Sequence, residues 1–304
     1  MRLAFLISAH TDPHHLKRLI EALPLAADFY VHIDLKADIH DFESLIHDDR
    51  VTFIQERYDV MWGSFKQVQF QMALLRAALT SSRKYDYLIT MSGLDYPIWS
   101  NQRITDFFEE NKGKEFISGM LLTEREKTHS VSIYRSYWFL YHYSWPYGTL
   151  KSKFRVALRK ALYALGVRKP LYTMVDGQRY DVCQGPDWWA VTSELAAYML
   201  DFTDHHPSFV SYFKTLFSPN EGIWQTIAYH SPFAKRCMFR ESPYPGLCKL
   251  TPLTYVEYPK EVKVFTEDDY ETILNSGKLF CRKTVTGKSD RLMDMIDRIR
   301  CISQ

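Results

Sequence analysis

The spacing of apolar and polar positions over the first hundred residues predicts short buried strands that alternate with amphipathic helices. The first apolar run, Leu3 to Ala9, has the length of a strand. Asp12 and Pro13 follow it as a capping residue and a first-turn proline, which predicts a helix to about Leu23. Strands separated by helices favour parallel β-α-β units and hence an α/β fold. The other elements predicted here are strands at Phe29 to Asp34, Val51 to Gln55 and Tyr87 to Met91, and helices at Asp41 to His47 and Ser64 to Thr80.

The carboxyl ends of these predicted strands should share one edge of a parallel sheet. Open α/β sheets bind their ligands beyond that edge. The rule places Ala9, His10, Asp34 and the stretch from Ser92 to Asp95 on one crevice. The first hundred residues are therefore predicted to form a Rossmann-like half.

The middle of the chain has a different composition. Eight of the fourteen residues from Tyr134 to Tyr147 are aromatic, and Lys151 to Lys169 carries seven Lys or Arg and no Asp or Glu. Apolar residues recur there at helical spacing between Ser152, a candidate cap, and Gly166, a candidate end, which predicts a basic amphipathic helix. Such a helix either docks on an anionic membrane or packs its apolar face onto the domain while its charges stay solvated. The apolar positions are Phe154, Leu158, Leu162 and Leu165.

Strand and helix signals return after Gln184. They predict a strand at Trp188 to Thr192 and helices that begin near Ser193, Pro207 and Glu221. The chain contains no internal repeat, low-complexity tract or linker rich in Pro, Gly or Ser. One compact domain with an aromatic and basic insertion near its centre is expected.

The composition excludes several classes of protein. Of the 304 residues 46% are hydrophobic, and the formal charge is +2, which fits neither disorder nor general nucleic-acid binding. No apolar run is long enough for a membrane span, and the five cysteines form no C-x-x-C pair, which favours free thiols and a cytoplasmic protein. Aromatic residues make up 15% of the chain, and their rings suit sugars or membrane interfaces as well as a core.

Familiar catalytic motifs are absent from the chain. It has no G-x-x-x-x-G-K-[ST], G-x-G-x-x-G, G-x-S-x-G or H-E-x-x-H, and no D-x-D pair of the kind that holds a divalent cation in many sugar-nucleotide enzymes. If this protein binds a nucleotide diphosphate, another group must neutralise the phosphates, and the candidates are the fixed cations Arg282 and Lys283, helped by Lys260. Basic clusters are also common on ordinary solvated surfaces. The histidines lack a third ligand at a suitable spacing, so no metal site is predicted.

Two carboxylates allow both a functional and a structural interpretation. Asp34 ends a predicted strand, where it could accept hydrogen bonds from a uracil or a ribose, or simply cap the following turn. Glu221 stands at a predicted helix start beside Trp224, where the helix dipole could hold it ionised while the indole shields it from water. Such a carboxylate suits a general base, although acidic residues in first turns are common for stability alone. The residues by themselves leave both alternatives open.

Seven stretches of the chain resemble, in the same order, one family: the core-2/I-branching β-1,6-N-acetylglucosaminyltransferases and the related peptide O-xylosyltransferases. The stretches are LAFLISAH, FYVHIDLKAD, VMWGSFKQVQ, YLITMSGLDYPI, GPDWWAVTSELAAYML, SPNEGIWQTI and LFCRK. The resemblance implies an α/β fold of the GT-A type and a UDP-sugar donor that carries GlcNAc or xylose. It also implies catalysis without a divalent metal or another cofactor, and inversion at the anomeric carbon by one direct displacement.

The resemblance also implies roles for individual residues. Glu221 occupies the position of the catalytic base, and built-in cations take the place of the metal ion. By the same resemblance residues 1–100 form the nucleotide-binding half, residues 130–170 are an insertion, and residues 181–304 hold the acceptor, base and phosphate contacts of a single domain. The implied donor contacts are Ala9, Asp34, Val60, Met61 and Trp62 for the nucleotide, Asp187 and Trp188 near the sugar, and Arg282 and Lys283 for the diphosphate, with Lys260 as a looser match.

Departures from the family pattern limit what the resemblance implies. The chain has SPNE where SPDE is usual and FCRKT where FARKF is usual, which keeps the base and the cations but leaves the donor sugar open. The missing N-terminal anchor and the odd cysteine count indicate a bacterial-type cytoplasmic enzyme. If residues 134–169 dock on a membrane rather than pack onto the domain, the enzyme is peripheral on the inner membrane face. Its expected partners are a UDP-sugar and a glycan or lipid-linked glycan acceptor, without nucleic acid. The alternative is a catalytically silent carbohydrate-binding or membrane-docking protein of the same fold.

Overall fold

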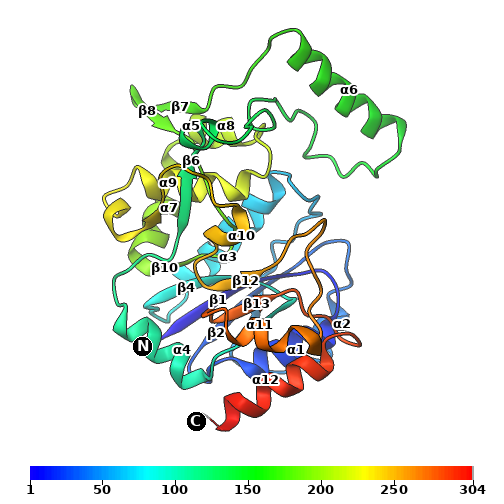
Figure 1. Cartoon of the computed structure of the whole chain (residues 1–304), viewed down its shortest axis with the longest axis vertical. Coiled ribbons are helices and arrows are strands. Elements are labelled where there is room, and N and C mark those ends of the chain that lie inside the picture. The colour runs from blue at the N-terminus through cyan, green and yellow to red at the C-terminus, as the bar shows by residue number, and fades with distance from the viewer. Residues whose placement is uncertain (303–304) are drawn as a thin grey trace.

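A computed structural model describes residues 1–302, and its centre is a five-stranded sheet in the order β10-β4-β1-β2-β3 (Figure 1). Strand β1 (Leu3–Ala9) pairs in parallel with β2 (Asp28–Ile33) and β4 (Tyr87–Ser92). Strand β3 (Val51–Phe53) extends the parallel part, and β10 (Ala190–Thr192) is antiparallel to β4. The predicted α/β fold with a parallel sheet is confirmed.

The sheet separates two hydrophobic clusters because successive side chains of a strand point to opposite faces. Helix α1 (Pro13–Ala22) covers one face, and α3 (Lys66–Leu79) covers the other. Along β1, Phe5 joins the α1 cluster and Leu6 joins the α3 cluster. The predicted start of α1 is confirmed, because the Asp12 carboxylate accepts a hydrogen bond from the His15 N–H (3.0 Å). The predicted helix after β2 is short, α2 (His40–Glu43).

A second sheet, which the sequence did not predict, joins the end of the chain to its first half. Strand β13 (Phe280–Arg282) lies between β12 (Thr254–Val256) and β5 (Asp95–Pro97). Its antiparallel register with β5 sets Arg282 opposite Asp95. Helices α11 (Tyr270–Leu274) and α12 (Asp290–Ile302) complete this part, beside α1 (Figure 1). Helix α4 (Asn101–Glu110) follows β5 in the chain.

The remaining elements lie on the α3 side of the central sheet and beyond it (Figure 1). Helix α7 (Ser193–His205) packs against α3, and α9 (Ile223–Tyr229) follows a single 3-10 turn (Pro219–Glu221). The other elements are β6 (Ser118–Leu121), α5 (Leu122–Glu126), β7 (Tyr172–Val175), β8 (Gln178–Asp181), β9 (Cys183–Gln184), α8 (Pro207–Phe213), β11 (Met238–Phe239) and α10 (Leu247–Leu250), with a 3-10 turn at Ala234–Arg236. A further 3-10 turn at Glu267–Asp269 packs instead against α11 and α12.

Helix α6 (Leu150–Ala164) is the predicted basic helix, and it stands at the periphery of the molecule (Figure 1). The predicted cap was wrong: Thr149, not Ser152, caps the helix by accepting from the Ser152 N–H (3.2 Å). Gly166, just past the helix, has a φ of +83°, as expected at a helix end. None of the helices of residues 1–302 is both long and apolar enough to cross a membrane.

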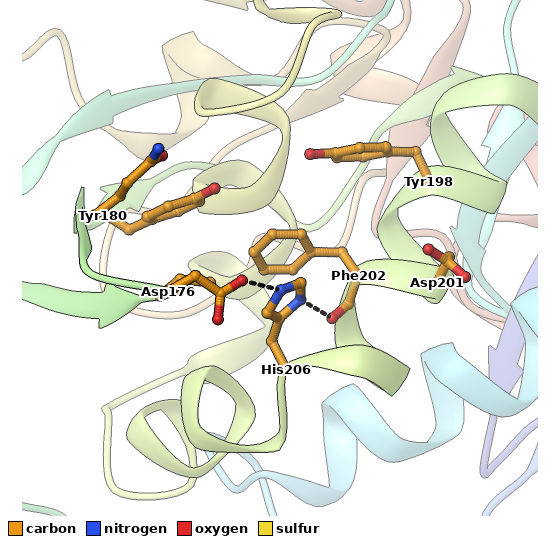
Figure 2. A pocket seen from close by; sticks show the side chains of 8 residues that line it. Asp176, Tyr180, Tyr198, Asp201, Phe202 and His206 are labelled. Carbon is orange, nitrogen blue, oxygen red and sulfur yellow. Dashed lines mark hydrogen bonds and ion pairs between the residues drawn. The ribbon is translucent and has the colours of Figure 1, made fainter.

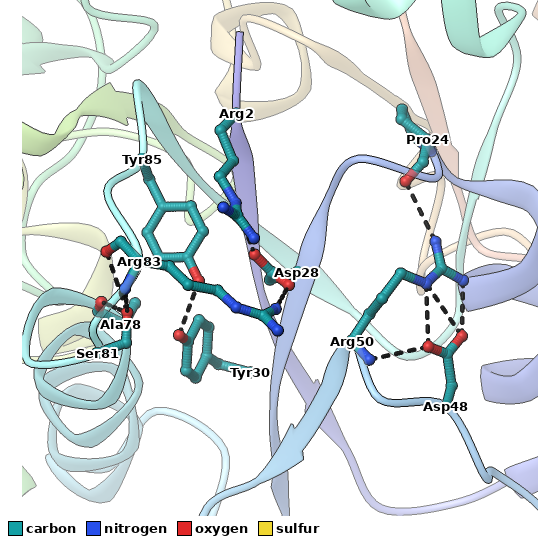
Figure 3. A network of polar contacts seen from close by, with 10 residues as sticks. All are labelled: Arg2, Pro24, Asp28, Tyr30, Asp48, Arg50, Ala78, Ser81, Arg83 and Tyr85. Atoms are coloured by element: carbon teal, nitrogen blue, oxygen red, sulfur yellow. Dashed lines mark hydrogen bonds and ion pairs between the residues drawn. The ribbon is translucent and has the colours of Figure 1, made fainter.

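A polar network fixes the amino ends of the central strands. The buried Asp28 carboxylate, at the start of β2, pairs with Arg2 (3.1 Å) and Arg83 (Figure 3). The hydroxyls of Tyr30 and Tyr85 lie 2.9 Å apart beside it. This edge is closed by its own contacts, which leaves the carboxyl edge for a ligand.

All five cysteines are free, which confirms that prediction.

Candidate functional site

The carboxyl edge of the central sheet carries the first predicted residues. The Asp34 N–H donates to the Ala9 carbonyl (2.9 Å), which joins the ends of β2 and β1. The buried Asp34 carboxylate accepts from the Lys36 N–H (2.9 Å), from Lys36 Nζ (3.0 Å) and from the Val60 N–H (3.2 Å). Asp34 therefore caps the turn after β2 and holds the Val60 loop beside it, while its contact with a nucleotide stays a prediction.

His10 lies between Asp34 and the basic pair of the C-terminal segment. Burial lowers the pKa of His10, Asp34 acts against that shift, and Arg282, Lys283 and Lys36 lower the pKa further. All four charged groups are thus close to one imidazole, although the chain brings them from distant segments. The edge therefore gathers three cations around one histidine whose pKa they lower.

Arg282 is held in place by the buried carboxylate of Asp95. Its Nη1 lies 3.1 Å from Asp95 Oδ1, and Trp188 Nε1 donates to Asp95 Oδ2 (3.1 Å). The guanidinium carbon also lies 5.5 Å from the centre of the Trp188 ring. Within residues 1–302 the buried Nε of Arg282 has no hydrogen-bond partner. Arg282 is therefore a cation that Asp95 and Trp188 hold in a fixed position.

Lys283 is the more accessible cation of the pair. Burial is the largest cause that lowers the pKa of Lys283. The charge of Arg282 lowers it further, while the charge of Glu261 raises it. Lys260 lies exposed in the loop after β12, and no interaction found within residues 1–302 joins its side chain to the basic pair. Its neighbour Glu261 acts on the pKa of Lys283 but Lys260 does not, so Lys260 stays a loose candidate.

Asp187 and Glu221 form a pair of carboxylates on the other side of Arg282. Gln71 Nε2, on α3, donates to Asp187 Oδ1 (2.5 Å), while Gln71 Oε1 accepts from the Trp224 indole (2.6 Å). Burial raises the pKa of Asp187, and the Gln71 and Asn220 side chains and the charge of Arg282 act against that rise. A buried amide therefore connects Asp187 to the helix that follows Glu221.

Glu221 ends the 3-10 turn that precedes α9. Gln184 Nε2 donates to Glu221 Oε2 (3.1 Å), and the Gly185 N–H donates to the Glu221 carbonyl (2.9 Å). Burial and, second, the charge of Asp187 raise the pKa of Glu221 to about 8. The expectation that a helix dipole keeps Glu221 ionised is therefore wrong, because burial and a like charge outweigh the dipole. A carboxylate that titrates near neutral pH is suited to proton transfer.

Arg125, Gln184 and Tyr244, which the sequence analysis did not single out, surround Glu221 together with Tyr134 of the aromatic segment. Arg125 Nη1 donates to Gln184 Oε1 (2.7 Å), so Arg125 orients the amide that binds Glu221. The Arg125 guanidinium carbon lies 4.1 Å from the ring centre of Tyr244 and 5.2 Å from that of Tyr134. The charge of Glu221 contributes to the raised pKa of both tyrosines. Their positions follow no spacing rule, so only the fold reveals this wall.

The Val60, Met61 and Trp62 loop lies between Asp34 and the turn that carries Glu221. Trp62 is 60% exposed, and its ring centre lies 5.4 Å from that of Phe217. Gly63 has a φ of +75°, which a side chain would disfavour, so the glycine lets the loop turn against Phe217. The structure therefore brings the predicted donor contacts to one region, with Lys260 at its margin.

An open cavity of about 300 Å³ lies elsewhere, between the β7–β8 hairpin and α7 (Figure 2). His206 Nε2 contacts Asp176 Oδ2 (3.2 Å), and its Nδ1 contacts the Phe202 carbonyl oxygen (2.9 Å). No predicted site residue lines this cavity. Its lining residues are Val175, Asp176, Gln178, Tyr180, Tyr198, Asp201, Phe202 and His206.

Metal ligands are not clustered in the part of the chain that the structure describes. No group of three or more His, Cys, Asp or Glu side chains there could hold a metal ion. The three cations around His10 are instead the groups that could meet a diphosphate. Catalysis without a metal nevertheless stays a prediction.

Comparison with known proteins places this site in context. The family model for the Core-2/I-Branching enzyme matches residues 3–257. Xylosyltransferase oxt of Drosophila pseudoobscura pseudoobscura is 21% identical over 206 residues, which are 66% of this chain and 20% of that protein. The human beta-1,3-galactosyl-O-glycosyl-glycoprotein beta-1,6-N-acetylglucosaminyltransferase is 22% identical over 230 residues, 74% of this chain and 48% of that protein. The chain thus spans less than half the length of these relatives.

Among solved structures, an active-site mutant of LgtC is similar with a TM-score of 0.40 and 8% identity, over 100% of this chain and 95% of that one. A likeness at that score adds nothing to the assignment of the site. The matched family range ends before Lys260, Arg282 and Lys283, so the basic candidates rest on the structure and on the sequence resemblance.

The fold and the site together define an α/β protein with two half-buried carboxylates of raised pKa and fixed cations at the carboxyl edge of its parallel sheet. The chain belongs to the Core-2/I-Branching enzyme family, over most of its length.

Proposed function

We propose that this protein is an inverting glycosyltransferase that moves a sugar, GlcNAc or xylose, from a UDP-sugar to a hydroxyl of a glycan acceptor. The observation that carries the proposal is the position of Glu221. It combines a pKa of about 8 with a neighbouring carboxylate, Asp187, which is itself close enough to Arg282 for their charges to interact. A general base and a cation that can bind the diphosphate, both interacting with Asp187, suit direct displacement of UDP.

Glu221 takes the proton of the acceptor hydroxyl in the proposed reaction. The acceptor oxygen forms a bond to the anomeric carbon as the bond between that carbon and the UDP oxygen breaks, and UDP leaves with the electron pair. Arg282 and Lys283 stabilise the negative charge that develops on the diphosphate. Asp34, Ala9 and the Val60 loop contact the nucleotide, while Asp187 and Trp188 contact the donor sugar. The reaction uses no divalent metal.

The acceptor in this proposal approaches along the wall that Arg125, Tyr134 and Tyr244 form beside Glu221. Aromatic rings stack on sugars, and a guanidinium donates hydrogen bonds to hydroxyls. We propose a glycan acceptor, either free or lipid-linked. A lipid-linked acceptor would bring the protein to a membrane, with residues 134–169 as the contact.

The alternative proposal is a silent protein that binds carbohydrate or membrane but transfers no sugar. A thermal-shift panel of UDP-sugars, followed by assay of UDP release, separates the two. The proposed function predicts that one UDP-sugar at about 100 times its Kd adds about 2.7 kcal/mol to the stability and that UDP is then released to an acceptor. Glycan binding without any stabilisation by UDP-sugars would favour the silent protein.

The rate of transfer is expected to rise with pH up to about 8. A general base must be deprotonated to act, and the surroundings of Glu221 raise its pKa from 4.5 to about 8. Below that value kcat/KM should fall about tenfold for each pH unit, because the ionised fraction of Glu221 falls in proportion. A pH profile of kcat/KM in saturating acceptor checks this, and a profile that is flat from pH 5 to 8 would contradict it.

A further inference from the structure

Helix α6 packs in the opposite sense to an ordinary surface helix. A surface helix normally buries its apolar face and exposes its charges. In α6 the buried side chains are Ser152 and Arg155, whereas Leu150 is 84% exposed and Phe154 is 58% exposed. One of the two arrangements left open by the sequence packs its leucines and Phe154 onto the domain while the charges stay solvated. That arrangement is wrong at Phe154, at Leu165, which is 80% exposed, and at Arg155.

Arginine side chains attach α6 to the rest of the protein. Arg155 Nη1 donates to the Tyr143 carbonyl (3.3 Å) and approaches Met61 Sδ (3.4 Å). The Arg159 guanidinium carbon lies 3.8 Å from the ring centre of Trp138. These contacts use the polar face of the helix. Phe154 and Leu165 stay exposed, while Leu158 and Leu162 are half-buried.

The outward face of α6 has an apolar stripe between lysines. Leu150, Phe154, Ala157 and Ala161 are exposed and recur three or four residues apart, which places them on one side of the helix, and Leu165 continues the stripe just past its end. Lysine side chains near such a stripe can reach outward past it with their charged ends. The exposed lysines that flank it are Lys151, Lys153 and Lys160.

The loop before α6 adds aromatic side chains to this surface. Tyr147 is 78% exposed and Tyr143 is 48% exposed. Tyrosine rings are enriched where membrane proteins meet the headgroup region, because the ring is apolar and the hydroxyl is polar. We define the docking surface as the outward stripe of α6, its three flanking lysines, Tyr143 and Tyr147.

The charge of this segment is strongly one-sided. Residues 134–169 contain eight Lys or Arg and no Asp or Glu, although the whole chain has a formal charge of only +2. Two copies of the docking surface would repel each other, which disfavours a second copy as the occupant. The lysines alone could bind any polyanion, but a bound polyanion would leave the apolar stripe between them exposed to water. A bilayer with anionic headgroups covers both the lysines and the stripe.

We propose that the docking surface binds the surface of an anionic lipid bilayer, with α6 lying flat in the headgroup region. Phe154, Leu150 and Leu165 enter the acyl boundary, and the three flanking lysines contact lipid phosphates. The same segment touches the donor site, because Arg155 contacts Met61 and Ser144 Oγ donates to the Asp59 carbonyl (3.3 Å). Docking would therefore place the Val60 to Trp62 loop beside the membrane. The proposal specifies the partner of the membrane contact proposed above, and it holds or fails independently of sugar transfer.

Flotation of the full chain with vesicles tests this proposal. We expect binding to vesicles of phosphatidylcholine with 30 mol% phosphatidylglycerol at low salt, weaker binding at high salt, and little binding to pure phosphatidylcholine. Replacing the three flanking lysines by glutamine should lower the partition coefficient about 100-fold, at about fivefold for each lysine. Equal binding to both kinds of vesicle would overturn the electrostatic part of the proposal.

A second variant tests insertion of the apolar stripe. The triple change Leu150→Ser, Phe154→Ser and Leu165→Ser alters only exposed side chains, so the fold should persist, and we expect at least a tenfold loss of vesicle binding. Leu25→Ser is the matched control, because Leu25 is 82% exposed outside the segment, and it should bind as wild type does. Full binding by the triple variant would overturn insertion. A wild-type dimer in solution that the triple variant abolishes, without vesicle binding by either protein, would assign the surface to a second copy instead.

Discussion

Replacing Glu221 by glutamine should lower the rate of sugar transfer by about 10²- to 10⁴-fold while donor binding is retained. Glutamine keeps the shape of the side chain and can still pair with Gln184, but it cannot accept the acceptor proton at the pH of the reaction. The matched control is Glu110→Gln, which changes an exposed glutamate at the end of α4 and should be as active as wild type.

The stability of the same variant gives an independent readout. The folded protein holds the Glu221 proton up to about pH 8, whereas an unfolded glutamate releases it near 4.5, so ionisation of Glu221 lowers the free energy of unfolding as the pH rises through that window. Glu221→Gln removes this loss and should melt at a higher temperature than wild type at pH 9. A variant that is folded and binds UDP, yet transfers sugar at the wild-type rate, would end the base assignment.

Arg282, the last residue of β13, and Lys283, which follows it, should respond differently to replacement by alanine. Lys283→Ala is expected to lower kcat/KM by about 10- to 150-fold with little change in melting temperature, since hydrogen bonds to charged groups contribute about 1.5–3 kcal/mol. Lys283 is partly exposed, and no ion pair found within residues 1–302 includes it, so its loss leaves no partner behind. The matched control is Lys288→Ala, an exposed lysine of the same segment.

Arg282→Ala should instead lower the free energy of unfolding by about 3–5 kcal/mol, because it leaves the fully buried Asp95 without its cation. Its activity can be interpreted only after that loss is measured by chemical denaturation. Wild-type kcat/KM for Lys283→Ala, together with an unchanged stability for Arg282→Ala, would contradict both roles.

Strand β1 and helix α1 could be predicted because the residues that specify each element are neighbours in the sequence. Strand β1 is an apolar run that only Ser8 interrupts, and α1 starts at a capping aspartate followed by proline. The second sheet could not be predicted, because its strands are three residues long and pair across distant parts of the chain. The pairing of Arg282 with Asp95 depends on that register, so the sequence alone left the arginine as one of several surface candidates.

The site shows the same division between local and tertiary signals. Glu221 could be singled out from its neighbours in sequence, but its raised pKa depends on Asp187 and on burial by the fold. Arg125 and Gln184 carry no motif, and their role follows only from the hydrogen bonds that lead to Glu221. In α6 the periodicity predicted the helix correctly, but a helical period cannot say which face meets the domain.

The anomeric configuration of the product tests the central claim most directly. Wild-type protein is supplied with UDP-GlcNAc or UDP-xylose and glycan acceptors in excess EDTA, and the transferred sugar is examined by NMR. The account predicts release of UDP in EDTA and a product of inverted, β configuration, formed through Glu221 and the fixed cations. A product of retained configuration, or turnover that appears only when Mn²⁺ is restored, would contradict it.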